Sequence, residues 1–299
     1  MIVLSRSRRV FAFDGDSEPA LSVRAGASVR LETADCFDGQ VQAQDDVLDA
    51  LDWDRVNPAT GPVYVEGARP GDVLSVLVES VDFGHQGVMA VAQGFGVLSE
   101  AFPEQLHRIV PIEDGTARIA DGVAVPLRPM IGVIGVAPAG APVSTASPGR
   151  HGGNLDTRLI TVGTTVYLPV AHEGALFAAG DLHAAMGDGE ICGTGVEVSG
   201  SIAVRVDVRS DLRIEEPVLE TRDLVVTIAS AETLDAAAET ATRHMAALLT
   251  QRMGISLEVA VMLMSAGGDV QVSQIVDPLR TARFALPKST IAGLGGELL

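Results

Sequence analysis

The chain has 299 residues, of which 47% are hydrophobic and 20% charged, and its formal net charge is −18. This composition is typical of a globular protein that buries a sizeable core, and it excludes a disordered chain. A nucleic-acid partner is also excluded, because such binding needs a basic surface and the basic residues cluster only at Arg6, Arg8 and Arg9.

Targeting and membrane-spanning patterns are absent from the sequence. No apolar run reaches the roughly 18 uncharged residues that a membrane helix needs, and the N-terminus does not have the pattern of a secretory signal. The two cysteines, Cys36 and Cys192, are too few for a disulfide framework. We therefore expect a cytoplasmic protein without a membrane partner.

The first 140 residues have the pattern of short strands separated by turns. Val23, Val29 and Leu31 alternate with polar residues. A strand through Leu31 would bring Asp35 to the same face, because side chains on one face recur every two residues. Asp35 is therefore a candidate metal ligand if that face borders a cleft, but Asp and Gly in 35–39 also favour a solvated turn.

Two further features precede the central segment. Residues 41–60 are acidic and rich in turn formers, and they contain the only tryptophan, Trp53. Trp53 is expected to pack against the body of the protein, with stacking on a substrate as the alternative. The dense apolar run 130–137 predicts a strand that is buried on both faces.

Residues 151–197 hold most of the side chains suited to chemistry. His151, Asn154 and Asp156 precede a β-branched segment at 159–170, and a second polar group follows it: Asp181, His183, Asp188 and Glu190. On a strand, Asp181 and His183 project to one face, and Asp188 and Glu190 have the same spacing. The sequence predicts that these side chains converge.

Carboxylate and imidazole groups that converge on one point are a common ligand set for a divalent metal. We expect Asp35, His151, Asp156, Asp181 and His183 as the ligands. Zinc is the preferred ion because it suits histidine with carboxylates, and calcium is the alternative. Such an ion activates water and polarises a carbonyl, while Glu190, with Asp188, moves protons as the catalytic carboxylate.

Other roles for these residues stay open. Asp188 fits a turn, and Arg158 fits a buried ion pair with Asp156 or Asp188. Cys36 is an alternative nucleophile, although Asp35 beside it would raise its pKa. Common lysine-dependent amidase chemistries are disfavoured, because the only lysine, Lys288, lies near the C-terminus.

The period of the pattern changes after residue 231. Residues 231–252 have apolar side chains at helical spacing, with Ser230 as the predicted N-cap and Gly254 as the end. A second helix is predicted at 256–265, then a strand at 270–275 and a tail from Asp277. The fold class is therefore mainly β with a C-terminal α+β part: a β-sandwich or barrel body of many short strands, plus two helices near residues 231–266. Residues 1–210 form the predicted body that carries the site, and residues 211–299 the α+β part.

Several segments resemble the acetamidase/formamidase family, and the resemblance covers nearly the whole chain. The matching motifs are DCFDGQ at 35–40, NPATGPVYVEGARPGD at 57–72, HGGNLDTR at 151–158 and GDLHAAMGDGE at 180–190. The resemblance implies a hydrolase of small linear amides that releases ammonia, has bound zinc or calcium, and assembles as a homo-oligomer, with a dimer favoured. It puts Asp35, His151, Asp156, Asp181, His183, Asp188 and Glu190 at the motif positions.

Two residues depart from the family pattern. Met186 stands where the family usually has Gln, and Leu155 where it usually has Met. A bulkier or more apolar amide, or a lactam, is therefore an alternative substrate. A non-catalytic metabolite-binding β-sandwich with a structural metal is the alternative from another functional class.

Overall fold

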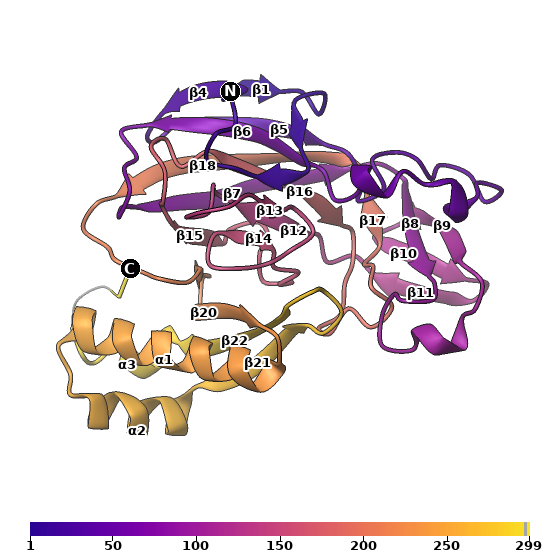
Figure 1. Cartoon of the computed structure of the whole chain (residues 1–299). Helices are drawn as coiled ribbons and strands as arrows, with labels where there is room; N and C mark the ends of the chain where they lie inside the picture. The colour runs from indigo at the N-terminus through magenta and orange to yellow at the C-terminus, as the bar shows by residue number, and fades with distance from the viewer. Residues whose placement is uncertain (296–297) are drawn as a thin grey trace.

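The computed structural model describes residues 1–295 and 298–299. Two large β-sheets form the body, and two long helices pack beneath one end of the first sheet (Figure 1). In spatial order, the described strands of the first, nine-stranded sheet are β1 (Ile2–Leu4), β5 (Ser28–Thr33), β18 (Gly200–Arg209), β7 (Val73–Phe83), β15 (Thr165–Pro169), β19 (Val218–Glu220), β20 (Leu224–Ala231), β22 (Arg280–Pro287) and β21 (Asp269–Gln274).

The second large sheet carries three of the polar residues singled out above, Asn154, Asp181 and His183. Its described strands follow the order β11 (Val123–Pro126), β10 (Thr116–Ala120), β9 (Leu106–Glu113), β8 (Gln86–Val91), β17 (Glu197–Val198), β16 (Phe177–His183), β12 (Met130–Gly135) and β14 (Gly152–Asn154). β6 (Ala59–Glu66) pairs with β16, and β2 (Arg9–Val10) and β4 (Leu21–Arg24) pair with β6. A small separate sheet joins β3 (Ala12–Phe13) to β13 (Val143–Ser144), and three single-turn 3₁₀ helices lie in loops: η1 (Leu48–Ala50), η2 (Trp53–Arg55) and η3 (Ser99–Ala101).

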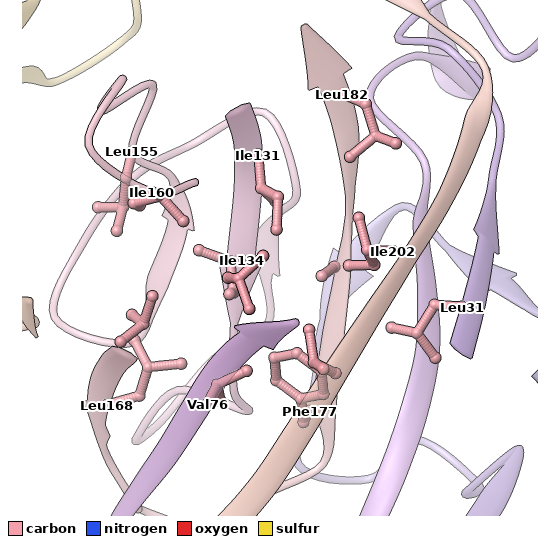
Figure 2. Packing of buried hydrophobic residues seen from close by; sticks show 14 of the residues in the cluster. Leu31, Val76, Ile131, Ile134, Leu155, Ile160, Leu168, Phe177, Leu182 and Ile202 are labelled. Atoms are coloured by element: carbon pink, nitrogen blue, oxygen red, sulfur yellow. The ribbon is translucent and has the colours of Figure 1, made fainter. Parts of the chain in front are cut away.

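The main core lies between the two large sheets. Leu31, Val76 and Ile202 of the first sheet belong to the same fully buried cluster as Ile131 and Phe177 of the second (Figure 2). Burying side chains of this size contributes about 1.5–3 kcal/mol each relative to leaving them exposed. Both sheets are thereby fixed face to face, and the loops at their ends are held in place.

The helices cover the C-terminal strands of the first sheet. α1 (Leu234–Met253) begins at Thr233, whose hydroxyl accepts a hydrogen bond from Ala236 N at 3.2 Å, and it ends at Gly254 in the left-handed conformation. Ser256 caps α2 (Leu257–Gly267) in the same way. A short α3 (Lys288–Ile291) follows β22. The predicted cap at Ser230 was wrong, because that residue still belongs to β20.

The mainly β fold with C-terminal helices is confirmed, as an open sandwich of sheets with no closed barrel among the described residues. The predicted tail from Asp277 was wrong in part, since it contains the buried strand β22. Arg283 interrupts the apolar pattern of that strand, yet its side chain is buried in an ion pair with Asp188. β20 and β22 continue the sheet begun by the N-terminal strands, so the division near residue 210 stays a prediction.

None of the helices in the described part of the chain combines the length and the apolar character that crossing a membrane requires.

Candidate active site

A cavity of about 250 Å³ opens where the loops at one end of the second sheet meet the β21–β22 loop. Its polar lining comes from distant parts of the sequence: Cys36, Asn154, Asp156, Asp181, Glu190, Glu197 and Asp277. Of the five carboxylates that line it, Asp156 and Asp181 are 1% and 2% exposed. Burying several ionisable groups together is costly, so such a cluster indicates a site rather than a surface.

His183 is the centre of the cluster. Its Nε2 lies 3.2 Å from Glu197 Oε1, 3.5 Å from Asp181 Oδ1 and 3.8 Å from Asp156 Oδ1. Asp181 and His183 both belong to β16, and the prediction that the two side chains meet is confirmed. Glu197 is the register partner of His183 across the antiparallel β16–β17 pair, which brings its carboxylate to the imidazole.

Gly132 of β12 makes room for the carboxylates beside it. A Cβ at this position would lie 2.4 Å from Asp181 Oδ2 and 2.5 Å from Asp156 Oδ1, so any larger residue would displace them. A glycine at the centre of a buried strand otherwise weakens that strand. Its presence here is explained by the close approach of the two acids.

Three of the cavity carboxylates have a strained backbone. The φ angles are 37° at Asp156, 54° at Asp181 and 48° at Glu190. A left-handed conformation at a residue other than glycine costs on the order of 1–3 kcal/mol and is found preferentially at functional sites. The strain aims these three side chains into one cavity, which supports a functional role for the cluster.

The electrostatics of the cavity favour a bound cation or protons. Burial raises the pKa of Asp156 to about 7 and that of Glu197 to about 8. Burial, followed by the charge of Asp156, raises the pKa of Glu190 well above its usual range. Burial by itself would lower the pKa of His183, but the carboxylates of Glu197 and Asp181 outweigh it and raise that pKa.

The donor set fits a divalent metal. Two groups have their ligand atoms within 4.8 Å of one another: Asp156 with His183 and Glu190, and Cys36 with Asp181 and Glu197. Several of these atoms are buried without a hydrogen-bond partner among the described residues: Asp156 Oδ1, Asp181 Oδ1, Glu197 Oε2 and both nitrogens of His183. Buried polar atoms of this kind are rare unless an ion or water binds them, and imidazole with carboxylates is a ligand set that zinc accepts.

Asp188 and Glu190 have different surroundings in the structure. Glu190 lines the cavity, whereas Asp188 accepts hydrogen bonds from Arg283 Nη1 at 3.0 Å and Nη2 at 2.7 Å. Arg158 Nε lies 2.9 Å from the same carboxylate, which agrees with the alternative that Arg158 forms an ion pair with Asp188. These contacts give Asp188 a structural role, because it neutralises a guanidinium that is almost fully buried.

Asp35 and His151 lie outside the cluster. Asp35 Oδ1 accepts from the backbone N–H groups of Phe37 and Gly39, and its Oδ2 accepts from Ser199 Oγ at 2.8 Å. The His151 ring packs edge-on against Phe13 and lines a separate cavity of about 470 Å³, and burial lowers its pKa to about 4. The structure therefore does not bring these two expected ligands to His183.

The residues that depart from the family pattern also lie outside the cavity. Leu155 is fully buried in the main core. Met186 lines an adjoining cavity of about 540 Å³, and Glu190 lines both cavities. Neither side chain lines the 250 Å³ cavity, so their effect on substrate choice stays a prediction.

Sequence reasoning missed Glu197 and gave Asp277 no role. Asp277 lines the cavity, and its Oδ2 accepts a hydrogen bond from Asn154 Nδ2 at 3.1 Å. Glu197 stands between Val196 and Val198 in an apolar strand, and a charged residue in such a setting was the signal that could have identified it. Cys36 lines the cavity too, but burial and the charge of Glu197 raise its thiol pKa, which disfavours a nucleophilic thiolate.

Comparison with known proteins identifies the family of this chain. The model of the acetamidase/formamidase family matches residues 11–144 and 139–291. The chain belongs to the acetamidase/formamidase family. Two solved structures of family members superpose on 98% of the chain with TM-scores of 0.96.

The first of these structures is an acetamidase of Bacillus halodurans, 49% identical and covered in full. The second is a predicted acetamidase/formamidase of Thermoanaerobacter tengcongensis, 46% identical and covered over 98% of its length. An acetamidase of Mycolicibacterium smegmatis is 28% identical over 260 residues, 64% of this chain. A putative formamidase of Schizosaccharomyces pombe is 30% identical over 264 residues, 66% of this chain, and the match spans 64% of the length of each of these two relatives.

Proposed function

We propose that the chain hydrolyses the carbon–nitrogen bond of small linear amides, with release of ammonia and a carboxylate. The observation that carries the proposal is that Asp156, Asp181 and Glu190 line one cavity and that buried His183 contacts the two aspartates. The relatives of the chain are named acetamidases and formamidases. Such a cluster provides both functions that amide hydrolysis requires, namely charge stabilisation and proton transfer.

We propose Asp156, Asp181 and His183 as the residues that hold a divalent metal, zinc in preference to calcium. When bound, the ion supplies Lewis acidity, which polarises an amide carbonyl and lowers the pKa of water. Glu197 Oε1 lies at the same ring nitrogen of His183, Nε2, as the two aspartates, and it would therefore stand beside the ion as a further carboxylate.

Glu190 is proposed as the proton carrier. Its carboxylate takes a proton from the attacking water as the water oxygen bonds to the carbonyl carbon. It then gives that proton to the amide nitrogen, which leaves as ammonia when the carbon–nitrogen bond breaks. Burial supports this role, because a raised pKa brings a carboxyl closer to the operating pH.

Ammonia release from a panel of amides, before and after treatment with a strong chelator, tests the function. Activity that is lost on chelation and restored by zinc supports the metal-dependent hydrolase. Activity that survives complete metal removal moves the chemistry to Glu190 and its neighbours. If the metal-loaded protein releases no ammonia from any amide of the panel, the proposal is contradicted and a metabolite-binding function is favoured.

We further propose that the chain forms a homodimer through α2 and the sheet edge at β21. α2 exposes Leu257, Val261 and Met262, each more than half exposed, and Val270 on β21 lies beside them. β21 is the last strand of its sheet, and Gly189 bridges to its end at Gln274, so the edge that a second chain would meet is the part of β21 before Ser273. Of the residues of α2, only Glu258 is charged, which lets two chains of net charge −18 approach at this face.

Light scattering of the wild type and of Met262→Glu tests the dimer. The wild type is expected at twice the chain mass of 31.0 kDa, and the variant at the chain mass. A wild type that stays monomeric at micromolar concentration contradicts the assembly.

A further inference from the structure

Three aromatic residues line the same cavity as the carboxylate cluster, namely Phe37, Trp53 and Phe95, and the last two contact each other. The rings of Trp53 and Phe95 lie 5.3 Å apart between centroids, with 40° between their planes. Trp53 is 42% exposed, whereas the carboxylates of the cluster are buried. The cavity therefore changes from a charged, buried end to an aromatic end that reaches solvent.

The segment that carries Trp53 is held to the residues beside the cluster. Gln40 Oε1 accepts a hydrogen bond from Asp52 N at 2.9 Å, and Asp52 caps the single-turn helix η2. Past Trp53, Asn57 N donates to Cys36 O at 2.7 Å. Both flanks of the tryptophan are thus tied to the turn that also contributes Cys36 to the cavity.

The segment that carries Phe95 is seated on the loop that carries Glu190. Gly94 and Gly96 have φ angles of 85° and 70°, and Val97 N donates to Ile191 O at 2.8 Å. A Cβ at Gly96 would lie 2.4 Å from Ile191 O, so only glycine allows this close approach. Phe95 is thereby fixed relative to Glu190.

Both aromatic residues are therefore positioned by contacts to cavity-forming segments. An aromatic pair of one exposed and one half-buried ring, Trp53 and Phe95, offers flat apolar surface with little loss of side-chain entropy. Formamide has no carbon beyond its amide group, and acetamide has only one. Neither has an apolar group large enough to fill the aromatic end of a cavity of about 250 Å³ while its amide group lies at the carboxylates.

We infer that the preferred substrates are amides with a branched aliphatic or aromatic group, which binds against Trp53 and Phe95. This inference rests on the proposed amide hydrolysis and names its substrate class. The amide group lies at the carboxylate cluster, and the apolar group lies at the aromatic end, where contact with the two rings removes it from water.

Steady-state kinetics with formamide, acetamide, isobutyramide and benzamide test the preference. The wild type is expected to show a kcat/KM for the two larger amides at least about tenfold above that for acetamide. Trp53→Ala and Phe95→Ala should each raise KM for the larger amides about tenfold, with less than about a threefold change for acetamide. Phe102→Ala, an aromatic of the same loop that does not line the cavity, is the matched control and should match the wild type.

Binding is measured separately from turnover through tryptophan fluorescence. Trp53 is the only tryptophan in the chain, so its emission reports on the aromatic end alone. In the Glu190→Gln variant, benzamide is expected to change this emission with a Kd at least about tenfold below that of acetamide. Equal or weaker binding of benzamide overturns the inference.

The two experiments separate this inference from the proposed function. Rapid hydrolysis of formamide and acetamide, with none of the larger amides, overturns the substrate class and leaves amide hydrolysis standing. Tight benzamide binding at Trp53 without hydrolysis of any amide keeps the aromatic subsite and contradicts the proposed function.

Discussion

His183 and Glu197 face each other as register partners of β16 and β17, with 3.2 Å between Nε2 and Oε1. Both side chains are almost fully buried. The strand pairing itself sets this contact, so it does not depend on a flexible loop. Asp156 and Asp181 approach the same nitrogen, so three carboxylates face Nε2, and replacing Glu197 tests whether this arrangement matters.

Glu197→Gln is expected to lower kcat/KM by about 10–100-fold, because it removes the negative charge of one of the three carboxylates that face His183 Nε2. The fold should persist, because the substitution keeps the shape of the side chain and removes a buried ionisable group. Ammonia release and thermal melting check both statements. Unchanged activity in a variant with unchanged metal content would remove Glu197 from the site.

Gly132→Ala is expected to abolish metal retention and activity, because its Cβ would enter the space of Asp181 Oδ2 and Asp156 Oδ1. Metal content is the readout besides turnover. Gly84→Ala is the matched control, since that glycine has open space around its Cβ position and no positive φ. A Gly132→Ala enzyme with wild-type metal content and activity would show that the acids are not held in the described positions.

Asp188→Asn is expected to destabilise the fold by about 2–4 kcal/mol, because it leaves Arg283 buried without its charge partner. Activity per folded molecule should fall by less than about tenfold. Urea denaturation measures the free energy of unfolding, and Asp207→Asn on an exposed position serves as the control, with a change below about 0.5 kcal/mol. Full stability with abolished turnover would instead make Asp188 catalytic.

The stability of the fold should depend on pH through Glu216, which lies away from the cavity. Burial raises its pKa to about 7, although Arg150 beside it acts in the opposite direction. A carboxyl whose pKa is raised by folding stabilises the fold when protonated, so its contribution is present at low pH and is lost as the pH rises through about 7. Replacement by Gln removes this dependence.

Urea denaturation of wild type and Glu216→Gln near pH 5 and near pH 8 measures that effect. The variant should gain stability relative to the wild type at the higher pH. An equal difference in unfolding free energy at both pH values would show that Glu216 titrates normally.

Part of this site could be predicted from local sequence. The two-residue spacing of Asp181 and His183 predicts their convergence, and Ser256 and Gly254 identify the helix limits from capping chemistry. Asp188 and Glu190 have the same two-residue spacing, yet they have different roles in the structure. Glu190 has a left-handed backbone, and Asp188 forms an ion pair with Arg283, which is 95 residues away in the chain. Such long-range pairings leave no periodic signal in the chain.

Glu197 shows a second limit of sequence reasoning. Its role depends on which strand pairs with β16, and pairing between strands is set by the whole sheet rather than by neighbouring residues. Asp35 was expected as a metal ligand, but its carboxylate accepts hydrogen bonds from the turn at Phe37 and Gly39 and from Ser199 instead.

The most direct test of the account is ammonia release by wild type and Glu190→Gln, each loaded with zinc, on the amide that the wild type hydrolyses fastest. The variant keeps the shape of the side chain but cannot carry the proton, so turnover should fall by at least about 10²–10⁴-fold while the melting temperature stays at or above that of the wild type. Wild-type turnover in a folded, metal-loaded Glu190→Gln protein would contradict the account.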